Sequence, residues 1–141
     1  GKPIFYSLGN FVFQNETFDP APADWYETVN LPETALASDL FDAFYKLPGF
    51  EWGSSNIWYE SVVAMPSFNG SELVGIKLYP IDLARTAPRS QRGTPRLADE
   101  EAGRRIIERI ARQSAAFGTT VVYENGVGIW RPGPANQSAK R

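Results

Sequence analysis

The 141-residue chain contains no cysteine and no histidine, and these two absences restrict its chemistry most. Without cysteine, neither a disulfide nor a thiolate metal site can form. Without histidine, the chain lacks the commonest metal ligand and the side chain most often used as a general base near neutral pH. A Ser-His-Asp triad and a zinc site built from His or Cys are therefore excluded within these residues.

Long hydrophobic runs are also missing from the sequence. No apolar stretch approaches the about 18 residues of a membrane-spanning helix, so we expect no membrane insertion by this chain. The sequence has no phosphate-binding loop, dinucleotide fingerprint or spaced cluster of metal ligands. A hydrophobic content of 43% with 13% aromatics nevertheless predicts a globular domain. We therefore assign no catalytic residue and no metal ligand to the chain.

The net charge of −2 conceals an uneven distribution. Residues 1–84 hold three lysines against eleven acids, whereas residues 85–141 hold eleven basic residues, ten of them arginine, against five acids. Attraction between the two halves is one interpretation, and a nucleic-acid patch is another. Because aromatic residues are not interleaved with the arginines and the whole chain is acidic, we expect no nucleic-acid partner.

The first part of the chain changes pattern near residue 15. Residues 3–7 and 11–13 are rich in β-branched and aromatic types, which predicts two short strands or one bent strand. Residues 15–58 contain four prolines and many aromatics, which indicates an irregular excursion with two short helices, one over 20–26 and one over 33–47. Its aromatic residues either cover the core, the interpretation we favour, or line a cleft; they include Trp25, Tyr26, Phe50, Trp52 and Trp58.

The remainder of the chain predicts a hairpin, a long helix and a second hairpin. Asn69-Gly70 and Asn125-Gly126 each separate two strand-like runs, the strongest short-range signal for a β-hairpin. Between them, residues 97–117 combine helical periodicity with acids early and arginines late, which complements the helix dipole. Residues 132–141 are polar, and we expect them to be disordered. The order of elements predicts an α+β fold.

Two groups of residues are candidates for binding. Ser7-Leu8-Gly9-Asn10 follows a strand-like run, where a backbone N–H and an amide side chain can contact a phosphate or a metal-bound water. The same four residues also suit an ordinary turn, because Gly and Asn tolerate positive φ. A second group, Arg85, Arg89, Arg92 and Arg96, either clamps an anionic substrate or forms a solvated loop paired with acids.

Five segments resemble a known family when they are read in order. They are "YSLGNFVF" at residues 6–13, "ESVVA" at 60–64, "LYPIDL" at 78–83, "RGTPRLA" at 92–98 and "SAAFGT" at 114–119. Together they resemble the C-terminal portion of the CapA-type poly-γ-glutamate capsule biosynthesis proteins, a bacterial metallophosphatase-like family. The resemblance covers nearly the whole chain and is weakest over residues 15–58.

The resemblance implies that residues 1–131 form the C-terminal portion of a layered α/β/β/α sandwich, with 132–141 as a tail. In the family, the residues expected to bind two divalent metal ions precede these segments, so the implied cofactors belong to a longer protein and none is expected in this chain alone. Substrate-binding roles are implied for Ser7, Gly9, Asn10 and Arg92. The implied partner is a missing N-terminal half of the same protein, or a second copy forming a homodimer.

The family resemblance implies a metal-dependent hydrolase acting on a phosphoester or an anionic cell-surface polymer, with this chain alone inactive. The alternative is a non-catalytic accessory module that binds an anionic polymer, such as poly-γ-glutamate, or a synthase subunit through residues 85–96. The localisation stays open, although a cell-surface or membrane-associated bacterial protein is compatible with the family.

Overall fold

The computed structural model describes residues 3–18, 20–50 and 55–133. The chain divides into two compact units. Unit 1 is built from residues 1–9, 60–82 and 97–141, and unit 2 from residues 10–59 and 83–96. Each unit therefore combines segments that are far apart in the sequence.

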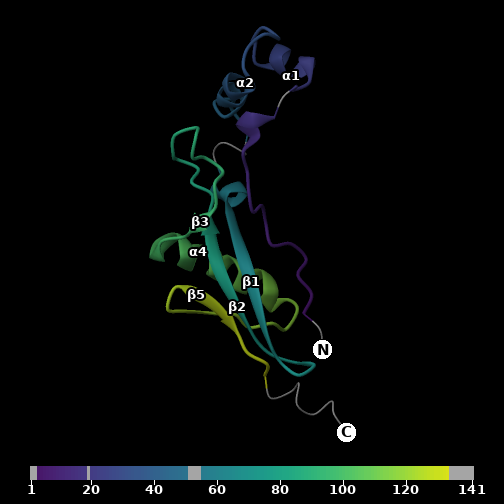
Figure 1. Ribbon diagram of the computed structural model, residues 1–141, viewed down its shortest axis with the longest axis vertical. Helices are drawn as coiled ribbons and strands as arrows, with labels where there is room; N and C mark the ends of the chain where they lie inside the picture. The colour runs from purple at the N-terminus through teal and green to yellow at the C-terminus, as the bar shows by residue number, and fades with distance from the viewer. Residues whose placement is uncertain (1–2, 19, 51–54, 134–141) are drawn as a thin grey trace. The chain divides into compact units, whose positions relative to one another are not determined.

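Unit 1 is centred on an antiparallel sheet (Figure 1). Its strands follow the order β1-β2-β5-β4, and β3 also pairs with β2. The strands are β1 (Glu60–Asn69), β2 (Glu72–Asp82), β3 (Arg96–Leu97), β4 (Val122–Glu124) and β5 (Val127–Trp130). The long pair β1–β2 forms most of the sheet, so β1 lies at one edge of it.

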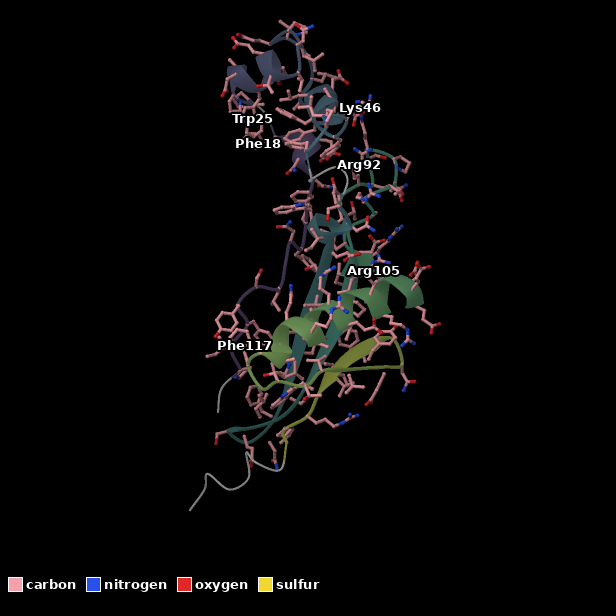
Figure 2. All side chains as sticks on the ribbon, turned by 180° about the vertical axis from the view of Figure 1, so that it is seen from behind. Phe18, Trp25, Lys46, Arg92, Arg105 and Phe117 are labelled. Atoms are coloured by element: carbon pink, nitrogen blue, oxygen red, sulfur yellow. The ribbon has the colours of Figure 1, made fainter. Side chains whose placement is uncertain are left out.

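One helix, α4 (Glu100–Ala115), packs across one face of this sheet (Figure 2). Asp99 caps its N-terminus by accepting a hydrogen bond from the backbone N–H of Ala102 at 2.8 Å. The helix has acids in its first turn and Arg112 in its last turn, as the sequence predicted. Its apolar side packs on the strands to form the core of unit 1, which consists of Val62, Leu78, Ile106, Ile107 and Val121.

The two predicted hairpins are both present, but their turns differ. Asn125 and Gly126 form the loop between β4 and β5 with φ values of 49° and 83°, the conformation for which Asn-Gly is preferred. In the first hairpin Asn69 pairs with Glu72, so the loop residues are Gly70 and Ser71. The turn therefore lies one residue later than Asn69-Gly70 predicts, and the positive φ of 59° still falls on glycine.

Unit 2 is a small, mainly helical body. It contains α1 (Ala23–Thr28), α2 (Ala37–Phe44) and the short 3-10 helices η1 (Asn15–Thr17) and η2 (Asn56–Tyr59). The buried side chains of Tyr26, Leu40 and Phe44 form its core, and Trp25 packs edge-on against Phe44. The excursion is therefore helical as expected, with both helices shorter than predicted. Trp52 lies outside the described residues.

The structure confirms an α+β fold with an antiparallel sheet and a few helices. Residues 3–7 and 11–13 are not strands, contrary to prediction. Among the described residues of unit 1, one backbone hydrogen bond, from Val62 N–H to Leu8 C=O at 3.1 Å, joins residues 3–9 to β1, and one bond makes no ladder. Residues 134–141 of the expected disordered tail lie outside the described residues, and the boundaries 1–131 and 132–141 stay predictions.

Candidate functional site

The Ser7–Gly9 segment of unit 1 is anchored against the start of β1. The carbonyl oxygen of Leu8 accepts hydrogen bonds from the Ser61 hydroxyl at 2.8 Å and from the Val62 N–H at 3.1 Å. The Ser7 hydroxyl accepts a bond from the N–H of Gly9 at 3.2 Å. These contacts form a turn that the Ser7 side chain stabilises. The segment therefore has the ordinary turn that was one of its two predicted structures.

Gly9 is required at this turn for two reasons. Its φ of 85° is disfavoured for residues that carry a Cβ atom, and a Cβ atom built here would lie 3.0 Å from the backbone oxygen of Glu60. The turn therefore approaches β1 more closely than another residue type allows.

The four predicted binding residues are divided between the two units. Ser7 and Gly9 belong to unit 1, whereas Asn10 and Arg92 belong to unit 2. Within unit 2, the Asn10 side-chain amide donates to the backbone oxygen of Trp58 at 3.3 Å. A common substrate site formed by all four residues therefore stays a prediction.

Beside the anchored turn, Glu60 forms a buried ion cluster that the sequence did not reveal. Its side chain is only 3% exposed, and its carboxylate accepts two hydrogen bonds from Arg105, at 2.8 and 3.0 Å, and one from Arg109. Figure 2 shows Arg105 on α4. The sequence signal for this cluster was the i,i+4 spacing of Arg105 and Arg109. That spacing places both arginines on one helix face but does not indicate which acid they contact.

In unit 2, Arg92 is held by carboxylates. Its guanidinium contacts Glu16 at 2.9 Å and Asp42 at 3.3 Å, and it lies 5.6 Å from the ring centre of Tyr45. The side chains of Arg92 and Glu16 are only 17% and 7% exposed, so this contact is poorly screened by water. Arg92 therefore ties the loop of residues 83–96 to η1.

Arg89 extends the same cluster towards solvent. It contacts Asp42 at 2.5 Å and Asp39 at 3.1 Å. Burial acts to raise the pKa of Asp42, but the hydrogen bonds and positive charges of Arg89 and Arg92 outweigh it and hold that pKa below its ordinary value. Two of the four arginines proposed as an anion clamp are thus paired with acids, and Arg85 donates to Asn56 at 2.7 Å.

A pair of tyrosine hydroxyls lies close to the Arg92 cluster. The Tyr59 and Tyr45 hydroxyl oxygens are 3.0 Å apart and hydrogen bonded, and Tyr59 is almost fully buried. Burial raises the pKa of both phenols, and for Tyr45 the bond to Tyr59 adds to this effect. Both groups are therefore held in the neutral form.

This pair predicts a loss of stability in alkali. Because the pKa is higher in the folded than in the unfolded state, the stabilising contribution is complete below about pH 10 and falls as the pH rises above that value. We expect Tyr45→Phe to weaken the dependence of unfolding free energy on pH above pH 10. Urea unfolding of the wild type and variant at a series of pH values measures it; identical slopes would contradict the prediction.

The described residues do not fit a metal centre. They contain no group of three or more His, Cys, Asp or Glu side chains arranged to hold a metal ion. The buried carboxylates of Glu60 and Glu16 are instead occupied by arginines. The metal ions implied by the family resemblance stay a prediction for the longer protein. In the same part of the chain, no helix has the length and apolar character needed to cross a membrane.

Comparisons with known proteins leave the family open. No family model matches the chain. Two curated relatives are the uncharacterized proteins y4sH and y4uA of Sinorhizobium fredii (strain NBRC 101917 / NGR234). Each is 35% identical over 137 residues, which covers 92% of this chain but 30% of the relative. The chain thus spans less than a third of the length of the relatives it matches.

Proposed function

We propose that this chain is the C-terminal portion of a CapA-type, metallophosphatase-like protein. The longer protein would be a metal-dependent hydrolase of a phosphoester or an anionic cell-surface polymer, linked to capsule or poly-γ-glutamate biosynthesis. The full α/β/β/α sandwich belongs to this proposal, as does a divalent metal pair bound by residues outside this chain.

The observation that carries the proposal is the mutual contact of the five segments quoted for the resemblance. In unit 1, segment 6–13 is bonded through Leu8 to segment 60–64, which pairs with segment 78–83 as adjacent strands. Segment 78–83 in turn accepts a bond from Ala98 through Pro80, and Tyr6 stacks on Phe117. Segments that contact one another in the folded unit depend on one another for their packing. These contacts support the interpretation of the five segments as one family pattern.

The alternative, an accessory module that binds an anionic polymer through residues 85–96, receives less support. Arg89 and Arg92 already contact carboxylates, so a polyanion would have to displace Asp42 and Glu16. Breaking a partly buried ion pair costs more than engaging a solvated arginine.

The test uses the longest natural polypeptide that contains this chain. We expect it to bind divalent metal ions and to hydrolyse a phosphoester substrate only when they are present. Absence of both metal and turnover would overturn the enzymatic proposal. Tight binding of poly-γ-glutamate by that same protein would then favour the accessory module.

Asn10 provides a residue-level test of the proposed site. We expect Asn10→Ala to lower kcat/KM by about a hundredfold, the usual cost of losing one positioned donor. Gln113→Ala, which removes an exposed amide from α4, serves as the control and should leave the rate unchanged. If Asn10→Ala folds normally by circular dichroism and retains full activity, Asn10 has no substrate-binding role.

A further inference from the structure

The sheet of unit 1 has a second face that α4 does not cover. Residues paired directly across an antiparallel sheet project to the same side. Val62 and Leu78 lie in the core beneath α4, so their neighbours along the strands project to the opposite side. We define the open face by five apolar residues that do so: Val63, Met65, Tyr79, Val122 and Ile129.

This open face is apolar and accessible. Met65 is 54% exposed and Val122 is 46% exposed, while the other three members are half-buried. Figure 1 views the sheet from this side, with α4 behind it, and no described helix or strand of unit 1 lies over the face. An apolar sheet face normally packs against another layer, because exposed apolar patches of this kind favour association.

The polar content of the open face limits what can cover it. Lys77 pairs with both Met65 and Ile129, so a basic residue lies in the middle of the apolar row. A layer that covers this row must supply an acceptor for Lys77, because a buried unpaired charge is costly. The surface that fits is therefore flat and apolar, with a carboxylate or carbonyl group opposite Lys77.

The apolar character continues at the edge of the sheet. Ile4 and Tyr6 are 76% and 79% exposed, and Tyr6 stacks on Phe117, which is itself 66% exposed. This segment is bonded to β1 through Leu8, as described above. Its exposed side chains add apolar surface at this edge of the sheet.

We infer that further polypeptide of the same longer protein covers the open face. The relatives y4sH and y4uA support this occupant, because the stretch they share with this chain is only 30% of their own length. Most of each relative is therefore available to pack on the shared part. The inference rests on the proposed function only in requiring a longer protein, and it requires neither metal ions nor hydrolysis.

Met65 reports directly on whether the face is covered, because it is the only methionine in the chain. Hydrogen peroxide oxidises accessible methionine to the sulfoxide, which adds one oxygen atom to the side-chain sulfur while the peroxide is reduced to water. Trypsin cleavage at Lys46 and Lys77 releases Met65 in one peptide, residues 47–77, that mass spectrometry can follow. We expect oxidation to be at least about tenfold slower in the longest natural polypeptide than in the 141-residue chain.

Three results would overturn the inference. The first is that Met65 oxidises at the same rate in both proteins. The second is that Met65 is protected in the 141-residue chain itself and that this protection grows with the chain's concentration, which identifies a second copy as the occupant. The third is a natural protein of only these residues that remains monomeric with Met65 freely oxidised. The comparison uses unmodified chains, so it does not depend on the folding of a variant.

A matched pair of substitutions in the longer protein locates the covered surface. We expect Ile129→Lys to bring the oxidation rate of Met65 close to that of the 141-residue chain, because a second lysine on the open face disrupts its packing. Leu36→Lys, at a 67% exposed position of unit 2, should leave the rate unchanged. Protection of Met65 without hydrolysis would retain this inference and reject the proposed hydrolase, and hydrolysis without protection would retain the hydrolase and reject both this inference and the sandwich.

Discussion

Gly93→Ala is expected to destabilise unit 2 strongly. Gly93 has a φ of 79°, and a Cβ atom built on it would lie 1.9 Å from the backbone oxygen of Phe13. Because that neighbour is backbone, it cannot move aside as a flexible side chain does. Two hydrogen bonds would be lost with the contact, from Phe13 N–H to Gly93 C=O at 3.0 Å and from Gly93 N–H to Leu83 C=O at 2.7 Å. We expect a loss of about 3–5 kcal/mol.

Gly49→Ala provides the control for this substitution. Gly49 lies in the same unit at almost the same φ, 80°, but a Cβ atom there meets no atom of the described residues within 4 Å. Only the conformational cost remains, about 1–2 kcal/mol. Urea unfolding followed by tryptophan fluorescence, with hydrogen exchange of unit 2 peptides, distinguishes the two. Equal losses for both variants would mean that the close approach of Phe13 to Gly93 is absent.

Glu60→Gln is expected to have the second-largest effect. The substitution preserves the shape of the side chain but removes the nearly fully buried negative charge that Arg105 and Arg109 contact. Removing one partner of a buried ion pair costs up to about 3–5 kcal/mol. Arg105 is 44% exposed and can be rehydrated, so we expect about 2–3 kcal/mol, measured as a lower urea midpoint.

The Glu124–Arg131 pair provides a comparison with similar chemistry and different burial. Its two hydrogen bonds, at 2.8 and 2.9 Å, are as short as those of Glu60 with Arg105, but both side chains are well exposed. We expect Glu124→Gln to change the stability only slightly, because exposed ion pairs are screened and solvated. A loss as large as that of Glu60→Gln would show that burial does not set the strength of these pairs.

The anchored turn supports the proposed substrate site, whereas the Arg92 cluster does not. Ser7 and Gly9 are held against β1, with Gly9 in a backbone geometry that strongly favours glycine, which is consistent with a rigid platform. Arg92 instead forms ion pairs with Glu16 and Asp42. Among the residues suggested by the family resemblance, Asn10 therefore has the most informative substitution, since its amide donates a hydrogen bond at the long distance of 3.3 Å.

Local sequence signals predicted the elements that depend on neighbouring residues. The Asn125-Gly126 turn, the acidic start of α4 and the α+β order of elements were all apparent from the sequence, because turn conformation and helix capping involve residues within a few positions of each other. The same signals predicted strands at 3–7 and 11–13, where they were wrong. A strand exists only through its partners, and the described residues provide too few bonds there to form a ladder.

The sequence alone determined that this chain lacks His and Cys chemistry, that it forms an α+β fold and that α4 carries an ordered charge pattern. Only the tertiary structure decided which charges meet: Glu60 with Arg105 and Arg109, and Arg92 with Glu16, across separations of 45 to 76 residues. It also left one apolar face of the sheet open. These features depend on long-range packing, for which the spacing of residues along the chain contains no direct signal.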